Sequence, residues 1–340
     1  MVFLKNLLKK CLVIEMIFYV YMSPEVIRDA NNGGPYAMDA FIGILLGFIQ
    51  NCCIFEFEDN RMQKAVFKNV DQLPPSDAKK KIMSLLGQLK KQKRFICHLI
   101  PNYNEENINI SDVNDQAKAS HVILDFLLAG KNEFSNILWK VESAALDNYN
   151  QSNFERKRSN LASNGRILRD GELEQFDFME EVFKKAFIHT TRIEICDRIF
   201  GEKFGDNFEY TFVTLFKWLE ETIAEPDHFE EVVIHCGKPK GLMDKHMKTQ
   251  LALAKKGKLS KLNIEIRFYH REESGRPLQA LTHDRYLMTD QIALNIGRGM
   301  DFLSENTKRN RDISINYAKA DEIKKSIKRF SEWMLEPVIV

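Results

Sequence analysis

One stretch of the sequence, LTHDRYLMTDQIALNIGRGMDFL at residues 281–303, brings together the residue types that phosphate chemistry requires. Its polar residues and glycines stand at fixed offsets, namely His283, Arg285, Asp290, Gly297, Arg298 and Gly299. An imidazole can serve as a nucleophile or as a general acid, and a guanidinium group can neutralise phosphate oxygens. The stretch therefore predicts a site that binds or cleaves phosphodiesters.

Two strands joined by a turn would position these side chains. Side chains alternate along a strand, so a strand over residues 283–288 places His283 and Arg285 on one face and Asp284 on the other. The apolar run QIALNI then returns as a second strand, with Asp290 near the turn. The glycine pair that follows permits a close approach of the backbone, which would bring N–H groups and the intervening arginine near the two strands.

The spacing resembles the signature of the phospholipase D superfamily. That signature reads His-x-Lys, four residues, Asp, six residues, and a glycine pair around one residue. His283-x-Arg285, Asp290 and Gly297-x-Gly299 match every interval, and the one departure is Arg285 in place of lysine.

One branch of the superfamily is more similar than the rest. It is the phospholipase D-like domain that accompanies microtubule-interacting-and-trafficking (MIT) domains in eukaryotes, together with its bacterial relatives. The similarity lies in HDR, IGRGMD, IEICDRIFG and the helix around Trp218, and it covers residues 190–320. The N-terminal half carries no three-helix pattern of the MIT type.

The resemblance implies a metal-independent phosphodiesterase without a cofactor. In this superfamily one histidine attacks phosphorus and forms a phosphohistidine, while a second histidine from a symmetry-related copy protonates the leaving group. Carried over, His283 is the nucleophile or the acid, Arg285 clamps the phosphate and Asp290 orients an imidazole, with Arg298 and its two flanking glycines as phosphate-binding residues. Because the chain holds one motif, a complete site implies a homodimer.

The arginine at position 285 favours phosphate recognition but can disfavour catalysis. A guanidinium group keeps its charge and binds phosphate through two hydrogen bonds, so phosphate recognition is retained. Its bulk could misplace the phosphate relative to His283. Eukaryotic members of the MIT-associated branch are thought of as phospholipid binders, and they depart from the signature at the position of Asp290. The aspartate retained here favours an active enzyme.

Each candidate residue also has a structural interpretation. His283 could be bonded to a neighbouring carboxylate, and Arg298 could cap the turn. Arg198 follows Asp197 after a predicted strand, where the pair could face the site as an accessory or form a surface salt bridge. His235 ends the strand-like run VVIHCG, so it is an accessory site residue or a satisfied core histidine.

The elements around the site alternate between strand-like and helix-like patterns, which predicts an α/β fold with two domains. Residues 1–147 form the first domain, whose rhythm favours a parallel Rossmann-like or PIN-like sheet. Within it, Ser76 caps a predicted helix, and ISDVNDQAKASHVILDFLLAG is expected to form another. Residues 148–175 are rich in Asn and Ser, which is typical of a linker. Residues 176–340 form the second, phospholipase D-like domain.

Acidic residues stand at the ends of predicted elements of the first domain: Asp29, Glu56, Asp59, Asp112 and Asp115. Carboxylates so placed could hold Mg²⁺ in a PIN-like nuclease sheet, whereas Asp112 could equally cap a helix. Their spacing is not diagnostic, and we predict no metal site. The first domain is then a sensor, a module that binds partner proteins, or a second nuclease.

Composition limits the classes of function. With 44% hydrophobic and 29% charged residues the chain can bury full cores, and its net charge of +1 means that any basic surface must be local. The lysines of KPKGLMDKHMK and LAKKGKLSK could follow a nucleic-acid backbone or be solvated. The six cysteines form no CxxC pair and predict buried, reduced thiols in a cytoplasmic protein. No apolar run has the length of a membrane span.

The setting of the site favours a nuclease over a lipase. A lipase needs an apolar platform to reach headgroups, whereas HREESGRPLQALTHDR around His283 is polar and suits a soluble polyanion. We expect a hydrolase: a homodimeric, metal-independent nuclease that acts on DNA or RNA in bacterial anti-phage defence. Two alternatives remain, a catalytically silent module that binds phosphate or membrane phospholipid, and an adaptor whose fold serves dimerisation.

Overall fold

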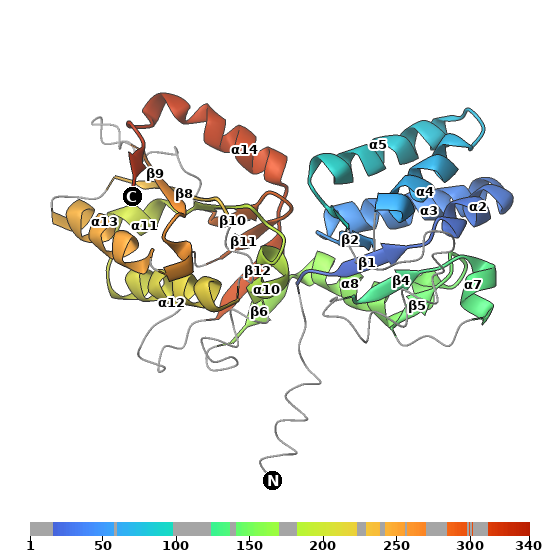
Figure 1. The fold of residues 1–340 in the computed structure, drawn as a ribbon, viewed down its shortest axis with the longest axis horizontal. Coiled ribbons are helices and arrows are strands. Elements are labelled where there is room, and N and C mark those ends of the chain that lie inside the picture. Colours follow the sequence, from blue (N-terminus) through green and yellow to red (C-terminus); the bar gives the residue numbers. More distant parts are fainter. Residues whose placement is uncertain are drawn as a thin grey trace, which may run out of the picture. The chain divides into compact units, whose positions relative to one another are not determined.

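The computed structural model describes most of the chain, namely residues 16–57, 60–97, 124–136, 141–169, 182–222, 229–238, 242–255, 257–269, 284–297, 299, 301 and 312–340. The chain divides into two compact units. We call Ile17–Ser163 the N-terminal unit, and Asn164–Val340 with Met16 the C-terminal unit. Each unit combines helices with one β-sheet, which confirms the α/β class (Figure 1).

The N-terminal unit is built on a five-stranded sheet of order β3-β2-β1-β4-β5. All neighbouring strands are parallel, as the alternating pattern predicted. The strands are β1 (Tyr19–Met22), β2 (Ile54–Phe57), β3 (Phe95–Cys97), β4 (Phe126–Leu128) and β5 (Ser143–Ala144). Strands β1, β2 and β4 are buried along their whole length, which explains why their sequences are apolar except for Glu56 in β2.

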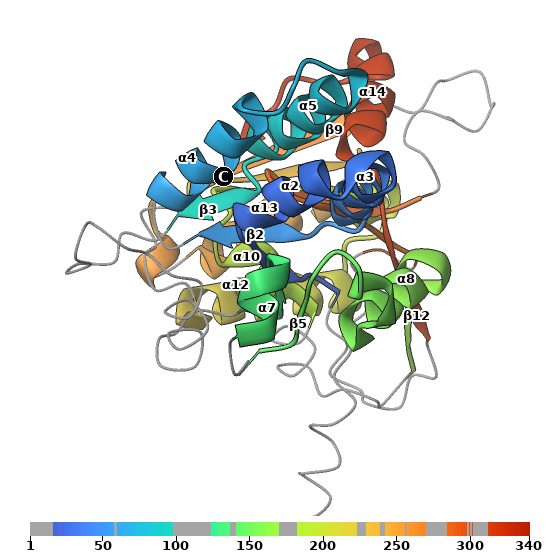
Figure 2. The same ribbon diagram turned by 90° about the vertical axis from the view of Figure 1, so that its right-hand side faces the viewer.

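Helices cover both faces of this sheet. They are α2 (Glu25–Asn32), α3 (Gly34–Gln50), α4 (Asn60–Asp71), α5 (Asp77–Lys91), α7 (Lys131–Asn136) and α8 (Asn153–Asn164), with a 3₁₀ turn η1 (Tyr149–Gln151). Figure 2 shows α3, α4 and α5 on one side and α7 and α8 on the other. The predicted cap of α5 is confirmed, because the Ser76 hydroxyl accepts a hydrogen bond from the Lys79 N–H at 3.1 Å.

Two predictions in this unit are wrong. The sequence pattern predicts a helix for the run FLL, but this run forms β4, since a short buried apolar run fits a parallel strand equally well. The predicted linker at 148–175 holds η1, α8 and a strand, and the units divide at Ser163; residues 170–175 lie outside the described part. Helix α8 packs into the core because the Phe154 ring stacks on Phe126 with centroids 4.3 Å apart.

The C-terminal unit is built on an eight-stranded mixed sheet of order β13-β9-β8-β7-β10-β11-β12-β6. Its strands are β6 (Arg166–Leu168), β7 (Arg192–Cys196), β8 (Glu231–Gly237), β9 (Asn263–Tyr269), β10 (Tyr286–Thr289), β11 (Ala293–Ile296), β12 (Ile313–Tyr317) and β13 (Val338–Ile339). Strands β7, β8 and β9 are parallel, and every other pair is antiparallel.

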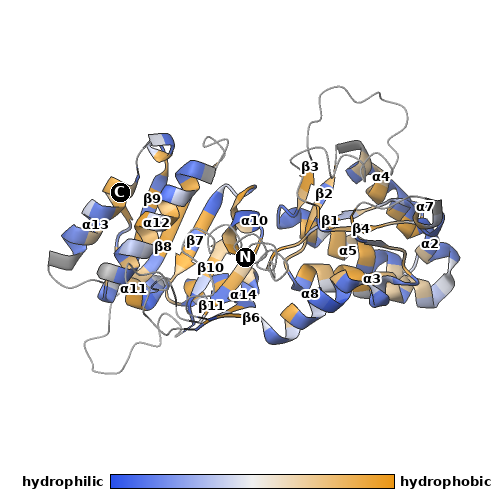
Figure 3. Ribbon diagram, turned by 90° about the horizontal axis from the view of Figure 1, so that it is seen from below, coloured by the Kyte–Doolittle hydropathy of each residue, from blue (hydrophilic) through white to orange (hydrophobic). Residues whose placement is uncertain are grey.

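Helices also cover both faces of the mixed sheet. They are α10 (Lys184–Phe187), α11 (Arg198–Glu202), α12 (Asp206–Thr222), α13 (Leu242–Ala254) and α14 (Ala320–Arg329), with 3₁₀ turns η4 (Gly257–Leu259) and η5 (Ser331–Trp333). Figure 1 shows α14 on one face and α12 and α13 on the other. Figure 3 shows that the sheet strands are mostly hydrophobic, whereas α13 and other outer helices carry both hydrophilic and hydrophobic residues.

The cysteines of the described core agree with the prediction of buried thiols. Cys52, Cys53, Cys196 and Cys236 are free and buried. Burial raises the pKa of the Cys196 thiol to about 12, so it is protonated at neutral pH. Among the described helices, none is both long and apolar enough to cross a membrane.

Candidate active site

Arg285 lies at the edge of the mixed sheet where the parallel strands end. Strand β10 runs antiparallel to β7 with Tyr286 opposite Cys196, so the residue before β10 is adjacent to the residue after β7. The Arg285 Nε atom lies 3.6 Å from Asp197 Oδ1, and its Nη1 donates a hydrogen bond to the Gly297 carbonyl at 2.9 Å. Functional groups gather at such carboxyl edges in α/β sheets.

Asp197 is the buried partner that holds this arginine. Its side chain is 0% exposed, whereas that of Arg285 is 22% exposed. The Asp197 carboxylate also caps α11, because its Oδ1 accepts the Ile199 N–H at 3.0 Å. Asp197 therefore forms a buried ion pair with Arg285 rather than the surface salt bridge that was one interpretation. Arg198, the predicted accessory, is the partly exposed first residue of α11.

The two glycines of the motif serve close packing. Gly299 has φ +80°, and a Cβ atom there would lie 2.0 Å from Asp197 Oδ2 and 2.2 Å from Arg285 Cδ. The Gly297 N–H donates to the Ser314 carbonyl at 2.9 Å, and the Gly299 N–H donates to the Ile296 carbonyl at 2.8 Å. Both N–H groups are therefore engaged within the protein, and their predicted role as phosphate donors does not fit this arrangement.

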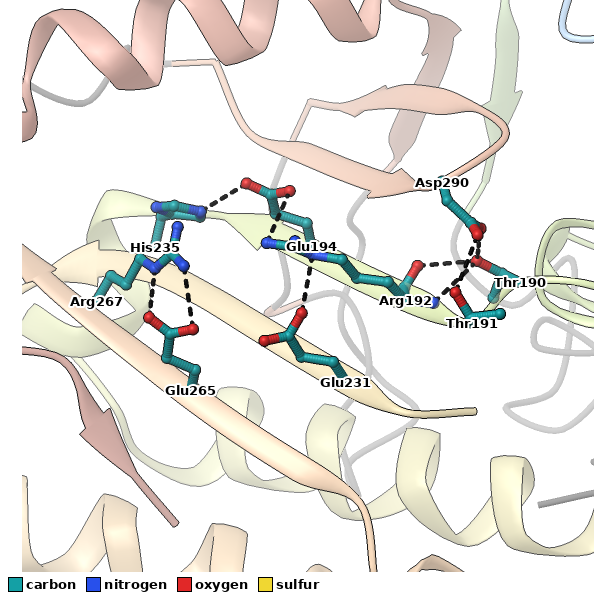
Figure 4. A network of polar contacts seen from close by, with 9 residues as sticks. All are labelled: Thr190, Thr191, Arg192, Glu194, Glu231, His235, Glu265, Arg267 and Asp290. Atoms are coloured by element: carbon teal, nitrogen blue, oxygen red, sulfur yellow. Dashed lines mark hydrogen bonds and ion pairs between the residues drawn. The ribbon is translucent and has the colours of Figure 1, made fainter. Parts of the chain in front are cut away.

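Asp290 lies at the other end of β10 from Arg285. It follows the strand at the predicted turn, and its carboxylate accepts hydrogen bonds from the hydroxyls of Thr190 and Thr191, the latter at 3.1 Å (Figure 4). The two residues are five positions apart in extended chain, or about 16 Å. Its predicted role as the orienter of an imidazole beside Arg285 in the same chain does not fit this position. The carboxylate instead ties the β10–β11 hairpin to the segment before β7.

Two further candidates, His283 and Arg298, lie outside the described residues. The structure therefore brings together Arg285, Gly297 and Gly299 from the predicted set and adds Asp197 as a partner. Asp197 was noted in the sequence only as a neighbour of Arg198. Its pairing with Arg285 depends on strand register across 88 positions, which local sequence does not encode.

His235 belongs to the opposite face of the sheet from Arg285. The pairing places Tyr286, Cys196 and His235 in one row, and side chains alternate along strands, so Arg285 and Asp197 point to the other face. His235 is fully buried on the α14 face. The structure thus favours the satisfied core histidine over the accessory site residue.

Both ring nitrogens of His235 have partners, as Figure 4 shows for Glu194. Nε2 lies 2.7 Å from Glu194 Oε1, and Nδ1 lies 2.8 Å from the Tyr269 hydroxyl. Burial alone would raise the pKa of Glu194, but the hydrogen bond with His235 and the charges of Arg192 and Lys324 outweigh it, so this pKa lies below the usual value.

Further ion pairs extend this network along the sheet. Arg192 Nε lies 3.3 Å from Glu231, and Arg267 Nε lies 2.7 Å from Glu265 (Figure 4). The hydrogen bond from Arg267 is the main cause of a lowered pKa at Glu265. The signal for this face was present in the sequence, because charged residues alternate with isoleucines in RIEIC and NIEIRFY.

The N-terminal acids do not form a metal cluster in the described part of the chain. Asp29 Oδ2 accepts the Lys131 N–H at 2.6 Å, and Glu56 is buried within β2. Asp59, Asp112 and Asp115 lie outside the described residues. Where residues are described, no group of three or more His, Cys, Asp or Glu is arranged to hold a metal ion.

Comparison with protein-family models gives no match, and comparison with curated proteins gives no match either.

Proposed function

We propose that the protein is a phosphodiesterase of the phospholipase D type, a metal-independent nuclease that acts as a homodimer in the cytoplasm, in bacterial anti-phage defence. The observation that carries the proposal is the position of Arg285. It is a partly exposed guanidinium group, fixed by a buried carboxylate at the carboxyl edge of the sheet, two residues after His283. The mixed sheet and the 283–299 spacing support the same class.

In the proposed reaction an imidazole nitrogen of His283 attacks phosphorus, and the bond from phosphorus to the leaving oxygen breaks. His283 of a second copy donates a proton to that oxygen. Water then attacks the phosphohistidine, the phosphorus–nitrogen bond breaks, and the second histidine takes the water's proton. Arg285 neutralises the phosphate oxygens in both steps. The phosphate competes with Asp197 and the Gly297 carbonyl for this guanidinium group, since both contact it in the free protein.

Cleavage of labelled DNA and RNA with and without EDTA tests this proposal. We expect cleavage that resists EDTA, disappears in His283→Ala and falls strongly in Arg285→Ala. His246→Ala is a matched control, because His246 is an exposed histidine of the same unit that pairs with Glu209. Cleavage that EDTA abolishes and His283→Ala leaves intact would contradict the proposal and point to the N-terminal acids.

The same observation supports one alternative, a silent module that binds phosphate or phospholipid. Arg285 already has two partners, and a guanidinium group recognises phosphate without any chemical step. This alternative predicts binding to anionic vesicles that depends on Arg285, weakens with salt and comes without cleavage. If the protein neither cleaves nor binds vesicles yet remains dimeric, an adaptor role is favoured.

A further inference from the structure

The N-terminal unit holds a strongly basic helix pair, which shares no residue with the site described above. Residues 60–94, which contain α4 and α5, hold ten Lys and Arg residues against two aspartates, a net charge of +8. The whole chain carries only +1, so the remainder of the chain is acidic overall. The basic residues of this segment are therefore a local feature and do not reflect a generally basic protein.

Most of these lysines are exposed. The exposed members are Lys64 and Lys68 on α4, Lys80, Lys81, Lys90 and Lys91 on α5, and Lys93 just after it, which we call the basic patch. The two helices contact each other, and the Lys90 Nζ atom lies 5.8 Å from the centroid of the Phe67 ring on α4. The two basic helices therefore lie side by side.

The geometry of α5 places Lys80 and Lys91 on the same side of the helix. Ile82, Leu85, Leu86 and Leu89 are buried and define the core-facing side of the helix. Lys80 and Lys91 are eleven positions apart, which is close to three turns, so both lie on the opposite, outward side. At about 1.5 Å per residue they are roughly 16 Å apart. That distance equals about five phosphates along one strand of a duplex, which rise about 3.4 Å each.

The folded protein leaves this charge largely uncompensated. Lys80 pairs with Asp77, but Lys64, Lys68, Lys81 and Lys91 form no ion pair with any residue that the structure describes. Like charges placed close together on helices destabilise the fold. The patch therefore opposes folding slightly and is suited to a partner that supplies negative charge.

We propose that the basic patch binds the phosphodiester backbone of a nucleic acid. A linear polyanion can contact Lys80 and Lys91 together, and the patch offers charge without base-specific geometry. A membrane surface is the weaker candidate, because the apolar side of α5 is buried in the core and cannot insert between lipids. The inference concerns binding alone and does not require that His283 cleaves anything.

Binding is measured by fluorescence anisotropy with a labelled nucleic-acid single strand of 20 nucleotides and a labelled duplex of 20 base pairs. The host is the full chain carrying His283→Ala, in EDTA, so that the nucleic acid survives whether or not the proposed nuclease is active. At 0.15 M salt each phosphate contact contributes about fivefold to affinity, from a salt slope of about 0.9 per contact. The double variant Lys80→Ala, Lys91→Ala is therefore expected to bind roughly 30-fold more weakly and to lose about two units of slope.

The matched control is Lys325→Ala, Lys328→Ala, two exposed lysines of α14 in the C-terminal unit. We expect this control to change the affinity for nucleic acid by less than twofold. Circular dichroism checks that every variant is folded. The proposal is overturned if the host chain binds neither the single strand nor the duplex, or if the control variant loses as much affinity as the patch variant. It is also overturned if the patch lysines matter only for binding to anionic vesicles. If the native chain, which keeps His283, binds nucleic acid without cleaving it, the proposed nuclease is overturned and this inference stands.

Discussion

Replacing Gly299 with alanine should destabilise the C-terminal unit by more than the cost of holding an alanine in a left-handed backbone conformation. Gly299 has φ +80°, and a left-handed conformation costs a non-glycine residue about 1 kcal/mol. The new Cβ atom would also lie 2.0 Å from Asp197 Oδ2 and 2.2 Å from Arg285 Cδ, far inside contact distance. Asp197 is fully buried, so it can yield only by weakening its cap of α11 and its pair with Arg285. A lost cap costs about 1 kcal/mol, and overpacking typically costs 1–3 kcal/mol.

We therefore expect Gly299→Ala to lower the free energy of unfolding by about 3 kcal/mol, measured by urea denaturation. The buried Trp218 of α12 reports the unfolding of this unit by fluorescence. Gly34→Ala is the matched control, because Gly34 has φ +76° but no atom within 4 Å of the added Cβ. It lies in the N-terminal unit, so its effect is followed by circular dichroism in the same urea titration. It should cost about 1 kcal/mol. If Gly299→Ala costs no more than Gly34→Ala, the packing of Asp197 and Arg285 against this turn is refuted.

Three further predictions concern other parts of the molecule. Phe154→Ala should lower the stability of the N-terminal unit by about 3–5 kcal/mol in a urea titration, since the ring stacks on Phe126. Phe67→Ala, at a partly exposed ring, is the control and should cost clearly less. A fragment of residues 16–163 should unfold cooperatively, whereas one ending at 147 should not, because it lacks α8; equal melting of the two would show that α8 is dispensable. Glu194→Gln should cost about 1.5–3 kcal/mol at pH 7, as a charged hydrogen bond is lost. The folded state lowers the pKa of Glu194, so the stabilisation from its charged form is present above the ordinary carboxyl pKa and is lost as pH falls through the lowered value. The stability curves of the native chain and of Glu194→Gln should therefore converge in acid. Glu322→Gln, at an exposed carboxylate, should follow the native curve at every pH.

The β10–β11 hairpin could be predicted because its signals are local. Two short apolar runs, YLM and ALNI, flank a polar turn at Asp290, and glycines follow the return strand. Helix α8 could not be predicted in the same way. Its sequence is polar apart from Phe154 and a few small or apolar residues. It is held by the packing of the Phe154 ring against other aromatic rings and by Arg158, which reaches the Asn51 side chain 107 positions away. Composition describes such a segment as a linker, whereas tertiary packing makes it part of the core.

The site shows the same division between local and long-range information. The spacing that singled out Arg285 is local, but the partners of Arg285 and of His235 depend on strand register. The His235–Glu194 contact joins residues 41 positions apart, and the His235–Tyr269 contact joins residues 34 apart. Sequence alone placed His235 at the end of a buried strand without revealing which face it occupied. The strand register and the alternation of side chains along each strand place His235 on the opposite face of the sheet from Arg285.

The two cationic features of the chain differ in how their charge is compensated. Arg285 is paired with the buried Asp197, so a phosphate must replace an existing partner and gains only the difference between the two interactions. Such a site can orient a phosphate without binding it tightly. The exposed lysines of α4 and α5 largely lack carboxylate partners where the structure is described, so they release counterions when they meet a polyanion and gain the full electrostatic benefit. If the protein acts on nucleic acid, affinity should therefore come mainly from the basic patch and positioning from Arg285. Salt should then weaken binding far more than it slows the bound reaction.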